Sequence, residues 1–199
     1  MRKTEIVGKF ATPIWTYVLQ DYQEINEELL RHIYFLQKEN PTGVKKSNQL
    51  GWHSPNLDLS NNEIKKFFQK ISPAIKDVSE DMCWDLKNNQ VRVTNCWSII
   101  NKKFASNAGH IHANSLISSA YYVRASEESG KIVFDDPRPG ATIKKGPYNS
   151  LSPWNEGNVS IQPKEGLLIM FPSYLVHHVQ PNMSDQERII LSFNLDVVF

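Results

Sequence analysis

The sequence predicts an α+β protein in which two helices precede a β-sandwich or jelly-roll core. Two amphipathic segments lie within the first 85 residues, and at least seven short β-branched and aromatic runs, separated by turns, follow from residue 90. Helices followed by many short strands are typical of α+β folds with a sandwich or barrel core. The length of 199 residues fits a single domain, with a helical N-terminal support in residues 1–85 and a β core in residues 90–199.

The N-terminal region predicts a strand and then two helices. Residues 6–19 are rich in β-branched and aromatic side chains, as strands are. Asp21 is expected to cap the first helix, which ends near Lys38. Ser60 is expected to cap the second helix, in which Pro73 should introduce a kink or a break. The apolar face of the first helix comprises Ile25, Leu29, Ile33 and Leu36, and that of the second Ile64, Phe67, Phe68, Ile71, Ile75 and Val78.

The β core begins at Gln90, where the apolar period changes from helical to alternating. Strands are predicted over residues 90–100, 116–123, 131–134, 159–161, 166–171, 176–179 and 189–198, and a turn over residues 101–109. Two other segments lack a regular pattern. Residues 43–59 are turn-rich but contain aromatic residues, so we expect them to fold over the core. Residues 140–157 are too long for a simple connection, and such loops often act as lids or binding loops.

Composition narrows the class of protein. The net charge of +1 lacks the basic excess that general nucleic-acid binders show. No stretch approaches the roughly 18 apolar residues of a membrane span, and the first residues do not resemble a secretion signal. The only cysteines are Cys83 and Cys96, whose spacing does not suit a metal knuckle, so we expect two reduced, largely buried thiols. A cytoplasmic location is expected.

Histidines after residue 109 suggest a metal site. His110 and His112 are two residues apart, so on an extended backbone their side chains point to the same face. A third imidazole follows at His177 or His178, and Arg188 begins the last predicted strand. This set suits a metal ion with an anion anchor. Spacing alone leaves the alternative open that these histidines are ordinary packed or surface residues.

The order of the motifs resembles a known family. The segments concerned are Phe10–Trp15, Ser47–Asn48, Gly51–Ser54, Cys96–Trp97, His110–His112, Ser118–Tyr122, Gly130–Arg138, Phe171–His177 and Arg188–Asn194. In this order they resemble the oxygenases that use Fe(II) and 2-oxoglutarate on a double-stranded β-helix, and more narrowly a small family of such proteins in bacteria and their phages. The resemblance covers nearly the whole chain. It implies a double-stranded β-helix core, a jelly-roll or cupin-like fold, with the N-terminal helices packed on it.

The resemblance also implies roles for individual residues. His110, His112 and His177 would bind Fe(II), with His178 facing away because adjacent strand residues alternate. Arg188 would bind both oxygens of the distal carboxylate of 2-oxoglutarate. Further co-substrate contacts are expected from Tyr122, Ser118 and Ser192. Apart from the resemblance, the segments that could form a substrate opening contain Trp52, His53, Arg138, Tyr148 and Trp154; the equal alternative is that these side chains serve only in packing.

One departure from the wider superfamily concerns the ligand set. That superfamily pairs a histidine with a carboxylate two residues later, whereas here His112 follows His110 and Asn114 follows His112. We therefore expect a face of three histidines. The alternatives are the amide oxygen of Asn114 in a set with His112 and His177, and recruitment of Asp136 from the next strand, which topology should keep away from the metal.

Three functions follow from these patterns. The first is an Fe(II)- and 2-oxoglutarate-dependent oxygenase, a hydroxylase of a small molecule or a protein side chain, acting as a monomer or homodimer in a bacterial cell or phage-infected host. The second is a cupin-like dioxygenase with three histidine ligands and no 2-oxoglutarate. The third is a non-enzymatic jelly-roll binding module whose histidines are structural. The fold alone does not choose among chemistries.

Overall fold

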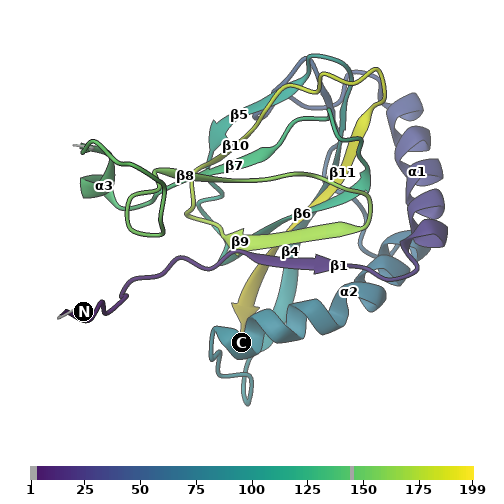
Figure 1. The fold of residues 1–199 in the computed structure, drawn as a ribbon. Helices are drawn as coiled ribbons and strands as arrows, with labels where there is room; N and C mark the ends of the chain where they lie inside the picture. Colours follow the sequence, from purple (N-terminus) through teal and green to yellow (C-terminus); the bar gives the residue numbers. More distant parts are fainter. Residues whose placement is uncertain (1–3, 144–145) are drawn as a thin grey trace.

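Two antiparallel sheets form the core of the protein. The computed structural model describes residues 4–143 and 146–199. The larger sheet has the order β1 (Trp15–Val18), β9 (Leu167–Pro172), β6 (Ile117–Arg124), β11 (Arg188–Val198), β4 (Gln90–Asn101) and β3 (Trp52–His53). The smaller has the order β2 (Asn48–Gln49), β5 (Ser106–His110), β10 (His177–Val179), β7 (Ile132–Asp135) and β8 (Asn158–Ile161). The predicted α+β class with a jelly-roll core is confirmed (Figure 1).

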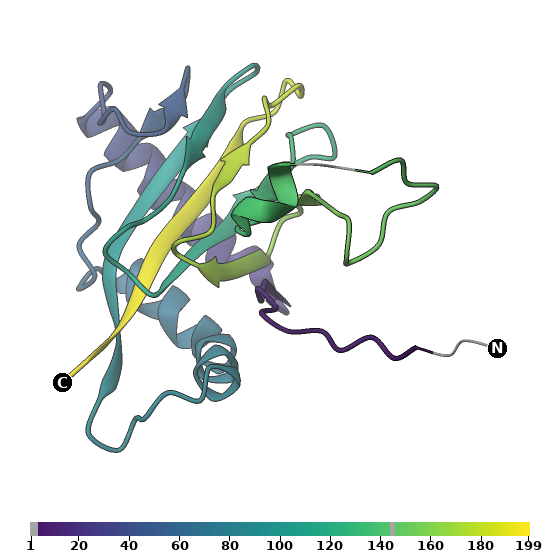
Figure 2. The ribbon, with the colours of Figure 1, turned by 90° about the vertical axis from the view of Figure 1, so that its left-hand side faces the viewer.

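The helices cover the outer face of the larger sheet. Figures 1 and 2 show α1 (Tyr22–Glu39) and α2 (Asn62–Asp81) on the side of this sheet that is turned away from the smaller one. Phe67 of α2 is fully buried, and its ring lies against Tyr121 of β6 and Phe193 of β11. The apolar stripes predicted for both helices therefore face the sheet, as amphipathic helices do.

The helix ends differ in detail from the predictions. Asp21 precedes α1 with φ of 48° and makes no capping hydrogen bond, so it does not cap the helix. Asn61, rather than Ser60, caps α2, because its side chain accepts from the backbone N–H groups of Glu63 and Ile64. Pro73 does not divide α2, which continues to Asp81. Pro73 lacks an N–H, and the carbonyl of Gln69 accepts a hydrogen bond from Ser72 Oγ instead (2.8 Å).

Several strand boundaries also differ. Only Trp15–Val18 of the predicted strand 6–19 is extended and paired. Residues 101–109, predicted as a turn, contain most of β5. The segment 43–59 supplies β2 and β3, which pair with β5 and β4, so it does lie over the core. Cys96 is buried as expected, whereas Cys83 is exposed.

A cavity of about 650 Å³ lies between the two sheets. Along β11 the residues alternate, so that Ile189 and Leu191 pack toward the helices while Ile190 and Ser192 line the cavity. Side chains of the smaller sheet and the segment 44–56 close the other walls. The loop that follows β7, which contains α3 (Pro139–Ile143), does not line this cavity. It lines, with the N-terminal segment, a separate cleft of about 420 Å³; residues 144 and 145 of that loop lie outside the described part of the chain.

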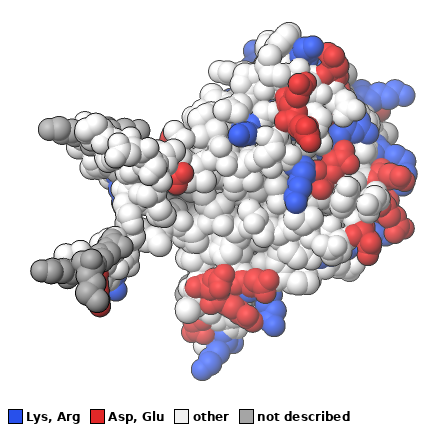
Figure 3. All heavy atoms as spheres, viewed as in Figure 1, with Lys and Arg blue, Asp and Glu red and all other residues white. Residues whose placement is uncertain are grey.

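None of the described helices combines the length and apolar character needed to cross a membrane. On the face seen in Figure 3, acidic and basic side chains lie side by side over the helices and the loops near them. Fewer charged side chains lie in the middle of that face. The surface pattern agrees with the small net charge of +1.

Candidate metal centre

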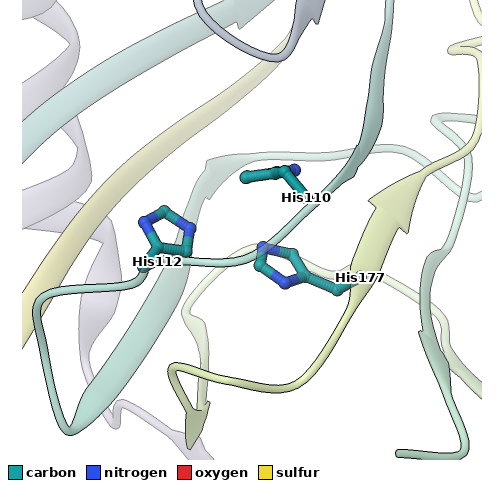
Figure 4. Close-up of side chains that lie close together, drawn as sticks. All are labelled: His110, His112 and His177. Carbon is teal, nitrogen blue, oxygen red and sulfur yellow. The ribbon is translucent and has the colours of Figure 1, made fainter.

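Three histidines converge at the end of the smaller sheet. His110 ends β5 and His177 begins β10, and the two are direct partners in the antiparallel pairing. His112 follows in the loop after β5, where its backbone N–H donates to the carbonyl of Ser173 (2.9 Å). One ring nitrogen from each histidine lies within 4.8 Å of the others (Figure 4). Metal–nitrogen bonds of about 2.0–2.1 Å would require only small ring movements from this arrangement.

Hydrogen bonds orient two of the rings. His110 Nδ1 lies 2.8 Å from the carbonyl oxygen of Ala108, and His177 Nδ1 lies 2.9 Å from that of Leu175. A carbonyl only accepts, so each Nδ1 carries the proton and each Nε2 has a free lone pair. This tautomer presents Nε2 as the metal ligand.

The surroundings favour neutral imidazoles. Burial is the main cause that lowers the pKa of His177 to about 3 and of His112 to about 4, with the neighbouring rings adding to the shift. Burial also lowers the pKa of His110. Since only neutral imidazole binds a metal, all three side chains are ready to do so at neutral pH.

None of the alternative ligands is among the residues that line the cavity. Asn114 is exposed in the turn that follows His112. Asp136 is paired with Arg138 (2.6 Å) and lies in the separate cleft. His178 is not part of the histidine group. The donor set that the structure brings together is therefore three neutral imidazoles, which suit divalent iron, nickel, copper or zinc.

Arg188 is a buried cation with an unused edge. Its side chain is 0% exposed, and Nη1 donates to the carbonyls of Ser129, Gly130 and Gln180. Nε and Nη2 have no hydrogen-bond partner among the described residues. These two groups lie on one edge of the planar guanidinium, the edge that binds both oxygens of a carboxylate. Burial lowers the pKa of Arg188 to about 10, so the group remains charged at neutral pH.

Of the other residues predicted to contact the co-substrate, two line the cavity and one does not. Tyr122 is fully buried on β6 and lines the cavity, and its Oη is also without a partner among the described residues. Burial raises the pKa of Tyr122 to about 12, which keeps the hydroxyl protonated as a donor. Ser192 lines the cavity as well. Ser118 is not among the residues that line the cavity, and its hydroxyl is bonded to that of Ser173 (2.7 Å).

Most of the residues predicted for the substrate opening lie away from the cavity. Trp52 is buried in the core beneath the helices, where its Nε1 donates to the carbonyl of Asn40 (2.8 Å). Arg138 and Trp154 line the separate cleft, and the exposed Tyr148 lines neither. Only His53 of this group lines the cavity, together with Lys46, Asn56, Asn95 and Trp97.

Gly130 was not predicted to belong to the site. It has φ of +80°, and a Cβ added to it would lie 2.9 Å from Nη1 of Arg188 and 2.5 Å from the carbonyl oxygens of Gln180 and Pro181. Because residue 130 has no side chain, its turn and the turn at residues 180 and 181 can close around the guanidinium of Arg188. A glycine after Glu-Glu-Ser is typical of any turn, so the sequence carries no specific sign of this role.

Comparisons with solved structures give the same fold. A Pseudomonas putida prolyl-4-hydroxylase superposes with a TM-score of 0.64 at 11% identity, over 93% of this chain and 92% of the other. The viral collagen prolyl hydroxylase of Paramecium Bursaria Chlorella virus-1, in complex with 2-oxoglutarate, gives 0.59 at 15% identity, over 92% and 94%. HygX from Streptomyces hygroscopicus, with nickel and 2-oxoglutarate bound, gives 0.62 at 10% identity, over 93% and 83%.

Among curated protein sequences, none matches the chain significantly. A family model does match, over residues 95–194, and its family is described as "Putative 2OG-Fe(II) oxygenase". The matched segment is half of the chain and contains the three histidines, Tyr122 and Arg188. With the two-sheet fold and the convergent histidines, this match establishes that the chain belongs to the 2-oxoglutarate/Fe(II) oxygenase family.

Proposed function

We propose that His110, His112 and His177 hold Fe(II), that Arg188 and Tyr122 hold 2-oxoglutarate, and that the protein oxidises a C–H bond of a second substrate in the cavity between the two sheets. When bound, the iron and 2-oxoglutarate would supply the oxidising chemistry, with succinate and carbon dioxide as the co-products. The residues of the chain bind and orient the reactants.

The unused edge of Arg188 is the observation that supports this proposal most. Arg188 is buried and forms no ion pair with any described residue, which is costly because its charge has been removed from water. The three carbonyls that accept from Nη1 satisfy only this one nitrogen of the guanidinium. A carboxylate bound to Nε and Nη2 would satisfy the rest and neutralise the charge. Tyr122 Oη, also unpartnered in the described structure, could donate a further hydrogen bond.

The cavity lining suits a dicarboxylic acid between the histidines and Arg188. His177 and Tyr122 line the same cavity. Arg188 is not among the lining residues, but it interacts electrostatically with Tyr122 and is two residues from Ile190 of β11, which lines the cavity. Phe171, Ile132 and Val179 add apolar walls that would surround the carbon chain and exclude water. The apolar pocket with a few polar groups is typical of small-molecule sites.

The second substrate would enter on the side of residues 44–56. That wall carries His53 and Asn56, and β4 adds Asn95 and Trp97. Lys46 is the only charged side chain among the described residues that line the cavity. We therefore propose a neutral or anionic substrate, either a small molecule or a protein side chain. The solved relatives include both prolyl hydroxylases and a protein crystallised with hygromycin B.

The decisive test is an anaerobic titration of the Fe(II)-loaded protein with 2-oxoglutarate, followed by the visible charge-transfer band. Arg188→Ala should raise the dissociation constant of 2-oxoglutarate at least about 30-fold, since losing one partner of a buried ion pair costs 2 kcal/mol or more. Arg188→Lys should also bind weakly, because it keeps the charge but loses the two-point geometry. Arg92→Ala removes an exposed arginine of β4 and should leave the titration unchanged.

Either of two results would contradict the proposal. Bound iron without a charge-transfer band would exclude 2-oxoglutarate as the co-substrate and favour a dioxygenase with three histidine ligands. Failure to bind any divalent transition metal, with the fold intact, would leave a jelly-roll binding module whose histidines are structural.

A further inference from the structure

The three histidines are supported in different ways. His110 and His177 each have Nδ1 fixed by the carbonyl two residues earlier in the chain. No hydrogen bond to the His112 ring is found among the described residues; only its backbone N–H is bonded, to Ser173. His112 also lies in a loop, beside Ile111, whose side chain is 47% exposed. Metal-binding histidines almost always have such a second partner, so its absence at His112 requires another support.

The ring of His112 lies instead in a row of nearly parallel rings. Its centroid is 5.4 Å from that of Trp97, with 24° between the planes, and 5.3 Å from that of His177, with 10°. On the far side of the row, His53 stacks on Trp97 at 5.9 Å and 6°. These distances are typical of offset-stacked aromatic pairs, whose stacking is favourable beyond the area they bury.

Trp97 is well placed to act as a fixed support. It lies on β4, between β11 and β3 in the larger sheet, and Ser192 is its register partner on β11. His53 lies on β3, and its Nδ1 is held 2.6 Å from the carbonyl oxygen of Ser54. The indole is therefore held by a paired strand of the sheet on one side and a stacked imidazole on the other, whereas His112 belongs to a loop.

We propose that Trp97 is the positioning residue for His112, and that its indole fixes the plane of this imidazole so that the ligand nitrogen faces the metal. Ring packing would do for His112 what a carbonyl does for His110 and for His177. The proposal rests on the three-histidine metal site proposed above. It goes further by assigning the role of the missing hydrogen bond to a side chain that supplies no ligand atom.

Titration of the metal-free protein with Co(II), followed by its visible absorption bands, tests this role without requiring a substrate. Trp97→Leu removes the stacked ring and should weaken Co(II) binding by about 10- to 100-fold, the usual effect of losing an outer-shell partner. Trp97→Phe keeps a flat ring and should bind within about threefold of the parent, since a phenyl group also stacks. Trp154→Leu makes the same change in the separate cleft and should not alter Co(II) affinity.

Tryptophan fluorescence gives a second measurement that does not depend on the Leu variant folding. An indole stacked on a metal ligand should be quenched when Co(II) binds. The Co(II)-dependent loss of emission should therefore be largely absent from Trp97→Phe, although that variant still binds Co(II). Circular dichroism of each variant verifies that the fold is retained.

Three outcomes would overturn the proposal. In the first, Trp97→Leu folds and binds Co(II) as tightly as the parent, with the same spectrum. In the second, Trp97→Phe loses as much Co(II) affinity as Trp97→Leu, and in the third, Co(II) quenches the fluorescence equally with and without Trp97. His110→Ala separates this failure from that of the metal site. If His110→Ala abolishes Co(II) binding while Trp97→Leu does not affect it, the metal site stands and only the role of Trp97 is wrong. If His110→Ala leaves Co(II) binding intact, the metal site itself is wrong.

Discussion

At the scale of single residues, Arg188 and Gly130 act as a unit. The guanidinium is enclosed by carbonyls from two turns, Ser129 and Gly130 after β6 and Gln180 before β11. These turns can approach so closely because residue 130 has no side chain and adopts a positive φ of 80°. The orientation of the free guanidinium edge therefore depends on a backbone conformation as much as on the arginine.

Gly130→Ala should disturb this unit. The new Cβ would lie 2.5 Å from two carbonyl oxygens, and the positive φ adds strain, so we expect a loss of about 1–3 kcal/mol in the free energy of unfolding. The 2-oxoglutarate affinity should fall as well, because Arg188 would be displaced. Urea denaturation measures the first effect. Gly109→Ala is a matched control: its Cβ would meet nothing within 4 Å, so its stability should stay within about 0.5 kcal/mol of the parent. Equal effects of the two substitutions would contradict this interpretation.

At the scale of elements, α2 shows which structural features a sequence pattern predicts and which it does not. Its apolar stripe was predicted correctly, because helical periodicity is a local property. Its cap was placed one residue too early, since Ser60 and Asn61 are both capping residue types and only the backbone angles decide between them. β5 was missed for a different reason. Its sequence, Ser-Asn-Ala-Gly-His, has no β-branched residue, and pairing with β10 and β2 makes it extended.

The cap of α2 gives a direct prediction. Asn61→Ala removes the acceptor of two backbone N–H groups and should lower the free energy of unfolding by about 1 kcal/mol. Ser60→Ala loses only an exposed hydrogen bond to Asp58 and should change it by less than about 0.5 kcal/mol. Thermal or urea denaturation of the two variants, compared side by side, would show the opposite order if Ser60 were the cap.

At the scale of the whole molecule, the convergence of the three histidines was easier to predict than the cavity around them. His110 and His112 are neighbours in sequence, and the motif order singled out His177 and Arg188. The structure brings the three histidines together. Trp154 and Arg138 were expected at the substrate opening because they lie in an irregular loop. Their actual position in a separate cleft depends on how that loop meets the N-terminal segment, which no local pattern encodes.

Ligand binding should stabilise the whole fold. A ligand at 100 times its dissociation constant adds about 2.7 kcal/mol to the free energy of unfolding, which for a chain of this length corresponds to a rise in Tm of roughly 5–10 °C. We expect this rise when 2-oxoglutarate is added to the Co(II)-loaded protein. Arg188→Ala at the same ligand concentration should show at most about a third of it, because a site that binds 30-fold more weakly gains only about 0.9 kcal/mol at that concentration. Differential scanning calorimetry measures both, and an equal rise in the two proteins would argue against Arg188 as the anchor.

The histidine set has no carboxylate, and this has a thermodynamic consequence. Three neutral imidazoles leave a divalent ion with its full charge of +2, and Arg188 is a further buried cation among the described residues. A dianionic co-substrate would lower the summed charge of the metal ion and Arg188 from +3 to +1, so metal and 2-oxoglutarate should bind cooperatively. By linkage, the factor by which 2-oxoglutarate raises the affinity for the metal equals the factor by which the metal raises the affinity for 2-oxoglutarate. In this protein the co-substrate would thus serve as part of the counter-charge of the metal, and iron retention would follow the cellular supply of 2-oxoglutarate.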